Sequence, residues 1–221
     1  MSIKVVPVEN RHNYKCAIFD MDGTLANTGK ITVPACIQAS HEYGITPPSE
    51  NEILGTIGIG GLDFYRKLFP LLDEEKILAI AERIFALEKE ISRELGSDLL
   101  FPNVAGLLAG LKAAGVNMAI ASTGETEHVE SVLTVTGIKH YFANIKCNTN
   151  DKIGQVRELK EIYQDYDMWM IGDKPKDSDA AKANSIPSIG VGYGFSSQDE
   201  LSGFDVIVNS AADIPGILEV K

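Results

Sequence analysis

An apolar run that ends in two carboxylates constrains the fold of this chain more than any other feature. Residues 16–19 are Cys-Ala-Ile-Phe, and Asp20, Asp22 and Gly23 follow almost at once. Such a run is typical of a buried strand, and side chains two apart on a strand point the same way. We therefore expect Asp20 and Asp22 to start on one side before Gly23 turns the chain. A bound Mg²⁺ would relieve their mutual repulsion, because it prefers oxygen ligands.

Aspartate and glycine are also ordinary turn residues, so residues 20–23 could simply cap a turn. Three later features favour the functional interpretation. The first is Ser122, which follows an apolar strand pattern at 116–121. The second is Lys152, at the start of a helical pattern. The third is Asp173, which follows an apolar strand pattern at 168–171 and has Asp177 four residues after it.

Together these features resemble the four motifs of the haloacid dehalogenase (HAD) superfamily, in particular its phosphoglycolate phosphatase and beta-phosphoglucomutase-like group with an inserted helical cap. The motifs are matched, in order, by Asp20-Met-Asp-Gly-Thr-Leu25, by Ser122, by Lys152, and by Gly172-Asp173 with Asp177. The first and the fourth motif carry most of the resemblance, because a single Ser or Lys is a short signal. The resemblance extends from about Tyr14 almost to the C-terminus.

The order of helical and strand patterns predicts an α/β fold with two parts. From Phe101 onward strand and helix patterns alternate, which is typical of a doubly wound parallel sheet, here a Rossmann-like HAD core. Residues 31–96 show helical patterns only, the longest at 73–95, and we interpret them as an inserted α-helical cap. We therefore expect a core of residues 1–28 and 98–221 and a cap of residues 29–97. Ligands of such sheets bind at the carboxyl ends of the strands.

The resemblance implies a role for each matched residue. Asp20 would be the nucleophile that forms an aspartyl-phosphate, and Asp22 the general acid and then the base. Ser122, with the main-chain N–H groups of Thr123 and Gly124, would bind the phosphoryl group. Lys152 would bridge that group and Asp20.

A bound Mg²⁺ is the cofactor that the resemblance implies. Its ligands would be the carboxylates of Asp20 and Asp173 and the main-chain carbonyl of Asp22. Asp177 would orient the metal waters or Lys152, although an N-cap for a helix starting at Ser178 is an alternative.

We expect a Mg²⁺-dependent phosphatase that hydrolyses small phosphomonoesters, either phosphoglycolate-like or sugar-phosphate-like. Asp22 favours phosphoryl transfer over dehalogenation, because relatives that cleave carbon–halogen bonds typically lack that acid. Two alternatives stay open: a beta-phosphoglucomutase-like sugar phosphomutase, and a non-catalytic binding protein on the same fold. Substrate choice would lie in the cap, where four cations are candidates for contacting a second anionic group: Arg66, Lys67, Arg83 and Arg93.

Composition limits the partners. The net charge of −11 argues against nucleic acid, whose phosphates require clustered Lys and Arg. No run of about 18 apolar residues suggests a membrane span, and the three widely spaced cysteines are predicted to be reduced thiols of a cytoplasmic protein. The expected partner is a small phosphorylated metabolite, with the protein a monomer or a homodimer. The four histidines show no metal-ligand spacing and are predicted to lie on helix faces or in loops.

Overall fold

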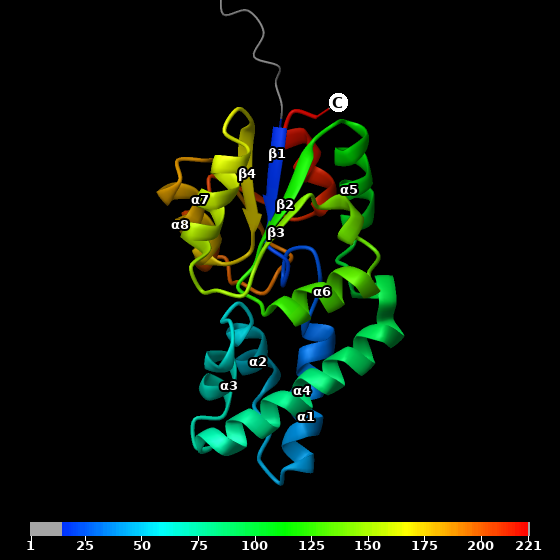
Figure 1. Ribbon diagram of the computed structural model, residues 1–221, viewed down its shortest axis with the longest axis vertical. Helices are drawn as coiled ribbons and strands as arrows, with labels where there is room; N and C mark the ends of the chain where they lie inside the picture. Colours follow the sequence, from blue (N-terminus) through cyan, green and yellow to red (C-terminus); the bar gives the residue numbers. More distant parts are fainter. Residues whose placement is uncertain (1–14, 221) are drawn as a thin grey trace, which may run out of the picture.

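The protein is described by a computed structural model that covers residues 15–220. Within these residues, parallel strands form one sheet in the order β3-β2-β1-β4-β5-β6 (Figure 1). The strands are β1 (Lys15–Phe19), β2 (Asn117–Ala121), β3 (Asn144–Lys146), β4 (Asp167–Gly172), β5 (Ser188–Val191) and β6 (Val206–Val208). The chain runs from β1 outward through β2 to β3 and then returns to β4 on the other side of β1. The strand order therefore reverses beside β1, where open α/β sheets bind their ligands.

The sheet is buried on both faces, which explains why its strands are continuous apolar runs. In β1, Ala17 and Phe19 face one hydrophobic cluster, whereas Cys16 and Ile18 face another. The first face is covered by α5 (Val104–Ala113), α6 (Thr126–Val135) and α9 (Ile214–Ile217). The second face is covered by α7 (Lys152–Ile162) and α8 (Pro175–Ala183). The result is a three-layer α/β/α arrangement, as the alternating patterns predict.

The remaining α-helices gather at one end of the molecule, beyond the carboxyl ends of β1 and β4 (Figure 1). They are α1 (Gly29–Glu42), α2 (Glu50–Thr56), α3 (Leu62–Leu68) and α4 (Glu74–Leu95). They share a third hydrophobic cluster, to which α4 contributes a stripe that includes Ile77, Ile80, Ile84 and Leu87. The division into a core of residues 1–28 and 98–221 and a cap of residues 29–97 stays a prediction, and residues 1–14 and 221 lie outside the described part.

Three elements differ from the sequence prediction. Helix α3 and strand β6 were not predicted; β6 has only three residues, too few for a periodic pattern to be recognised. Helix α8 begins at Pro175 rather than at Ser178, because proline fits a first helical turn, where its missing N–H leaves no bond unmade. Short 3₁₀ helices complete the described chain at Gly96–Leu99, Lys139–Tyr141, Glu200–Gly203 and Ala211–Asp213.

Among residues 15–220, none of the helices has the length and the apolar character that a membrane crossing requires.

Candidate active site

Asp20 lies at the carboxyl end of β1 in a buried ion-paired cluster. Its main-chain N–H donates to the carbonyl of Ile171 on β4 at 2.8 Å, which fixes the end of β1 against its neighbour. The Lys152 ammonium donates to Asp20 Oδ1 at 2.7 Å and to Asp177 Oδ1 at 2.6 Å. All three side chains are buried, with Asp177 fully so. Residues far apart in the sequence thus meet where the strand order reverses.

Charge within this cluster is unbalanced. Burial lowers the pKa of Lys152, but Asp177 and Asp20 more than offset this and raise the pKa, so the side chain is a permanent cation. Burial raises the pKa of Asp20 well above its usual value; Lys152 opposes the rise, and Asp177 and Asp173 add to it. One cation therefore faces several carboxylates in a site with little water. Such a site favours a further cation.

Asp173 follows β4 and offers a carboxylate oxygen without a partner. Its Oδ2 accepts from the main-chain N–H of Phe195 at 2.7 Å, but the buried Oδ1 makes no hydrogen bond within residues 15–220. Burial and the neighbouring Asp177 raise the pKa of Asp173 to about 7, against the effect of the Phe195 N–H. Carboxylate oxygens of Asp20, Asp173 and Asp177 lie within 4.8 Å of one another. An orphaned oxygen among hard oxygen donors fits a divalent cation such as Mg²⁺.

Two glycines allow this close approach. Gly23 has φ +83°, and a Cβ there would lie 2.4 Å from Asp173 Oδ2. A Cβ on Gly194 would lie 2.4 Å from the Gly23 carbonyl oxygen and 2.5 Å from Asp173 Cβ. Both positions exclude a side chain, because real contacts of this kind do not come so close. The segment 192–195 after β5 thus packs directly on the acidic cluster.

Asp22 occupies a different environment from Asp20. Its Oδ1 lies 2.9 Å from Nε2 of His128, which α6 presents from its first turn. Asp20 and Asp22 share no hydrogen-bond partner within the described chain, since the backbone leaves strand geometry after Phe19. The two acids, expected to start on one side of the chain, therefore end with different partners. Asp20 belongs to the acidic cluster, whereas the Asp22 carboxylate faces the helices α1–α4.

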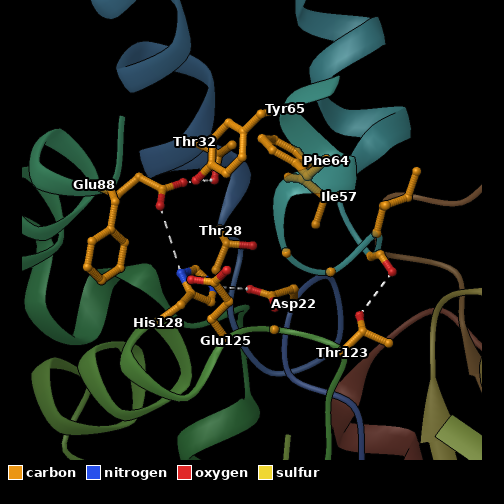
Figure 2. Close-up of a pocket in the computed structure, with 16 residues that line it drawn as sticks. Asp22, Thr28, Thr32, Ile57, Phe64, Tyr65, Glu88, Thr123, Glu125 and His128 are labelled. Carbon is orange, nitrogen blue, oxygen red and sulfur yellow. Dashed lines mark hydrogen bonds and ion pairs between the residues drawn. The ribbon is translucent and has the colours of Figure 1, made fainter. Parts of the chain in front are cut away.

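His128 links Asp22 to the long helix α4. Its Nδ1 lies 3.9 Å from Oε2 of the buried Glu88, whose Oε1 accepts from the Thr32 hydroxyl at 2.5 Å (Figure 2). Burial lowers the pKa of His128, but Asp22 and Glu88 outweigh this and raise it to about 9. Burial alone would raise the pKa of Asp22, yet His128 and nearby groups lower it below the usual value. Burial also raises the pKa of Glu88, opposed by His128.

Neither His128 nor Glu88 was predicted as a site residue. His128 was assigned to a helix face or loop, which is correct but misses that this face points at Asp22. The sequence does contain a feature that could have identified Glu88. It lies on the apolar stripe of its helix, four residues after Ile84, and a carboxylate buried there needs a partner. The corresponding feature for His128 is its position in the first turn of the helix that follows the strand ending just before Ser122.

The raised pKa of His128 predicts a pH-dependent stability. An unfolded histidine titrates near pH 6.5, so the stabilisation by charged His128 is complete below that pH and is lost as pH rises through about 9. Over this window we expect the free energy of unfolding to fall by about 3 kcal/mol more in the parent than in His128→Asn. Urea unfolding at a series of pH values measures this. The exposed His140 provides the control variant His140→Asn, and parallel curves for parent and His128→Asn would contradict the assignment.

The predicted phosphate-binding residues stand at the end of β2. Ser122 is buried, and its Oγ accepts from the main-chain N–H of Gly124 at 3.1 Å, which leaves its own O–H available as a donor. Gln155 Nε2 donates to the Ser122 carbonyl at 2.7 Å and fixes this turn. The Thr123 hydroxyl donates instead to the Gly58 carbonyl at 2.9 Å. Thr123 therefore holds the loop between α2 and α3 against the sheet end.

A second contact secures the same loop. The main-chain N–H of Gly60 donates to Asn150 Oδ1 at 3.1 Å, and a Cβ on Gly60 would lie 2.3 Å from the Thr123 carbonyl oxygen. Glycine is thus required for the close packing of this loop on Thr123. The segment Gly58-Ile-Gly-Gly61 lies between α2 and α3.

Asp177 is at the third position of α8. Because α8 begins at Pro175, the alternative that Asp177 is the N-cap of a helix starting at Ser178 is wrong in position. Asp177 Oδ2 nevertheless accepts from the main-chain N–H of Lys174 at 3.0 Å, which closes the first turn of the helix. Its other oxygen accepts from Lys152. The same side chain thus stabilises the helix start and orients Lys152.

A cavity separates the sheet end from the helices α1–α4 (Figure 2). About 80 Å³ of it is open to water, enough for several water molecules or a small leaving group. It is lined by residues from the sheet end, from α6 and from the segment that contains α1–α4: Asp22, Thr28, Thr32, 57–61, Phe64, Tyr65, Phe85, Glu88, 123–125 and His128. Asp22 is therefore placed to reach a molecule held in this cavity.

Comparisons with known proteins agree with this geometry. The family described as haloacid dehalogenase-like hydrolase matches residues 17–191, most of the chain, so the protein belongs to that family. A phosphoglycolate phosphatase of Agrobacterium fabrum is 27% identical over 219 residues, covering 92% of each chain. Such relatives indicate a phosphatase within this family of hydrolases.

Solved structures confirm the fold. A predicted phosphoglycolate phosphatase from Haemophilus somnus superposes with a TM-score of 0.80 at 23% identity, covering 94% of this chain and 99% of that chain. A beta-phosphoglucomutase from Clostridium difficile superposes with a TM-score of 0.76 at 20% identity, covering 93% and 96%. At these identities the likeness establishes the HAD fold, and the predicted resemblance to this group is confirmed.

Proposed function

We propose that this protein is a Mg²⁺-dependent phosphatase that hydrolyses small phosphomonoesters through an aspartyl-phosphate on Asp20. One observation carries the proposal: the buried Lys152 contacts both Asp20 and Asp177, next to the unpartnered oxygen of Asp173. Isolated acids in turns do not require such an arrangement. A nucleophilic carboxylate that must approach a phosphate dianion does, because positive charge has to offset the repulsion.

In the first step, an Asp20 carboxylate oxygen attacks phosphorus while the bond from phosphorus to the leaving oxygen breaks. Lys152 offsets the charge of Asp20 and of the incoming phosphoryl group. The leaving oxygen takes a proton through Asp22, which receives it from the charged His128 across their 2.9 Å contact. Ser122 and the N–H groups of Thr123 and Gly124 would hold the phosphoryl oxygens.

In the second step, a water molecule attacks phosphorus and breaks the bond to Asp20. Asp22, ionised after the first step, accepts the proton of that water and so acts as the base. Inorganic phosphate leaves and Asp20 is regenerated. The same carboxylate can serve in both steps because it faces the cavity and not the acidic cluster.

Mg²⁺ would be held by the carboxylates of Asp20 and Asp173 and by the main-chain carbonyl of Asp22. When bound, it supplies positive charge to the reacting phosphoryl group as a Lewis acid. Asp177 would act through Lys152, which it contacts, as a positioning residue. The donor chemistry supports this assignment, because carboxylate and carbonyl oxygens are the ligands that Mg²⁺ prefers.

Removal of the metal is expected to stop the reaction. After dialysis against chelator, phosphate release from p-nitrophenyl phosphate should fall by about 100-fold or more and return on addition of Mg²⁺. Colorimetric assay of the product measures this, and a circular dichroism spectrum before and after dialysis controls for unfolding. An unchanged rate without metal would contradict the assigned role of Asp173.

Two outcomes would redirect the proposal. Conversion of a sugar 1-phosphate into its isomer without free phosphate would indicate a phosphomutase, in which a sugar hydroxyl replaces water in the second step. Absence of turnover with every ester, together with tight binding of one of them, would indicate a binding protein on the same fold.

A further inference from the structure

The charged side chains that line the cavity are almost all acidic. Asp22 and Glu88 are carboxylates within it, and Glu125 adds a third at its exposed mouth. His128 is the one basic side chain among the lining residues that the structure describes. Figure 2 shows Glu88, Glu125 and Asp22 around the His128 ring. Among residues 15–220, no Lys or Arg side chain takes part in the wall.

The single cationic group is already shared. His128 contacts the Asp22 carboxylate with Nε2 and faces Glu88 with Nδ1. Lys174 and Lys176 approach the loop at Gly58 without lining the cavity, so an anionic group inside it would find no uncompensated positive charge among the lining side chains. It would instead approach the buried Glu88, where little water screens the repulsion, and pass Glu125 at the exposed mouth.

The cap cations do not correct this balance. Arg66 is bound at the surface by Asp63 and Glu74, and Arg83 by Glu42 at 2.6 Å. Neither these two nor the exposed Lys67 and Arg93 line the cavity. The expectation that these cations are candidates for contacting a second anionic group thus finds no support in the cavity wall.

The wall does offer partners for groups that donate hydrogen bonds. Glu88 Oε2 makes no hydrogen bond of ordinary length within the described chain, and its neighbour His128 Nδ1 is 3.9 Å away. The Thr28 hydroxyl is buried and has no hydrogen-bond partner of good geometry within residues 15–220, although it lies close enough to Asp22 to help lower the pKa of that carboxyl. The aromatic rings of Phe64, Tyr65 and Phe85 complete the wall. Rings and carboxylates suit alcohols and ammonium groups.

We propose that the cavity selects phosphomonoesters whose leaving group carries hydroxyl or ammonium donors and no second acidic group. This inference rests on the proposed phosphatase function and narrows its substrates to one class. It disfavours phosphoglycolate-like esters, one of the two kinds expected from the sequence, and favours the sugar- or polyol-like kind. Alcohol and ammonium leaving groups share one property, because both can donate hydrogen bonds to Glu88 and to Glu125 at the mouth of the cavity.

Three esters with a two-carbon leaving group test the proposal. The second carbon of the leaving group is a carboxylate in 2-phosphoglycolate, carries a hydroxyl in 2-hydroxyethyl phosphate and carries an ammonium group in 2-aminoethyl phosphate. With Mg²⁺ present, we expect kcat/KM for at least one of the last two to exceed that for 2-phosphoglycolate by about tenfold or more. A higher value for the hydroxyl ester identifies an alcohol-type leaving group, and a higher value for the amino ester identifies an ammonium type.

Variants connect the preference to the wall. Glu88→Gln is expected to shift the ratio of kcat/KM values about tenfold towards 2-phosphoglycolate, and Glu125→Gln about threefold, because Glu125 is exposed. Glu125→Gln keeps the test valid if Glu88→Gln does not fold. Glu130→Gln removes the same charge from α6 outside the cavity, where Glu130 pairs with Lys139, and should leave the ratio unchanged.

The outcomes separate this inference from the proposed function. Equal or greater kcat/KM for 2-phosphoglycolate, or ratios unaffected by both cavity variants, would overturn the inference while the phosphatase stands. No phosphate release from any of the three esters or from p-nitrophenyl phosphate would overturn the proposed function, and the inference with it.

Discussion

The Asp20→Asn variant is expected to release phosphate at least about 10⁴-fold more slowly than the parent protein. The carboxamide has the size of the carboxylate and keeps an oxygen that can accept from Lys152, so the site stays filled. It is a poor nucleophile, however, and cannot form the acyl phosphate on which the proposed two-step route depends. Initial rates with Mg²⁺ and the preferred ester measure the effect. Mass spectrometry after rapid acid quenching should detect a phosphorylated protein for the parent alone.

A matched variant separates the role of Asp20 from a general effect of charge. Asp167→Asn makes the same change at the exposed amino end of β4, away from the acidic cluster, and should keep the parent rate within about twofold. A rate for Asp20→Asn within tenfold of the parent would overturn the assignment of the nucleophile. Asp20→Ala provides a second variant that excludes slow conversion of Asn back to Asp as the source of residual activity.

The Lys152→Met variant is expected to lose about 3–5 kcal/mol of the free energy of unfolding, the cost of removing one partner from a buried ion pair. Methionine fills nearly the same space as the lysine stem, so packing changes little. Asp20 and Asp177 would then stay buried without the cation that contacts both of them. Urea unfolding, followed by circular dichroism, measures the loss. The variant should also be inactive, since Lys152 contacts the nucleophile.

Two comparisons test the physical cause of this loss. Lys146→Met removes a lysine that pairs with Glu158 at the surface, and should cost about 1 kcal/mol or less. Lys152→Met combined with Asp177→Asn should be more stable than Lys152→Met alone by about 1–2 kcal/mol, because one uncompensated charge is removed. A loss below about 1 kcal/mol for Lys152→Met would show that the buried contacts do not stabilise the fold.

The pH dependence of the same variant has a defined sign. Burial raises the pKa of Asp20 above its unfolded value, and Lys152 opposes that rise. Without Lys152 the folded state binds a proton more readily than the unfolded chain, so the stability of the variant should fall with rising pH above the unfolded pKa of about 4. The deficit relative to the parent should therefore be smaller at acidic pH. Unfolding curves at several pH values measure this difference.

Much of the fold and part of the site could be predicted from local sequence alone. Buried parallel strands need apolar side chains on both faces, so β1, β2 and β4 were visible as short apolar runs. The ends of those runs marked Asp20, Ser122 and Asp173, because parallel strands of one sheet present their carboxyl ends at one edge. Long helices such as α4 were visible through their apolar stripe. Strand β6 could not be predicted, because three residues are too few to show a periodic pattern.

Interactions between distant segments could not be predicted in the same way. The sequence suggested two uses for Asp177, and the structure shows the carboxylate both closing the first turn of α8 and contacting Lys152. The strand pattern predicted that Asp20 and Asp22 start on one side of the chain, whereas the tertiary structure pairs the Asp22 carboxylate with His128 and the Asp20 carboxylate with Lys152.

The sequence by itself determined the class of fold, the family and the acids expected at the sheet edge. Each of these depends on local periodicity or on a short motif. Only the tertiary structure decided which charges face which. The meeting of Glu88 on α4 with His128 on α6, and the absence of Lys and Arg from the described cavity wall, follow from how the helices pack on the sheet end. Charge balance in a cavity depends on distance and burial, and neither quantity is local in the chain.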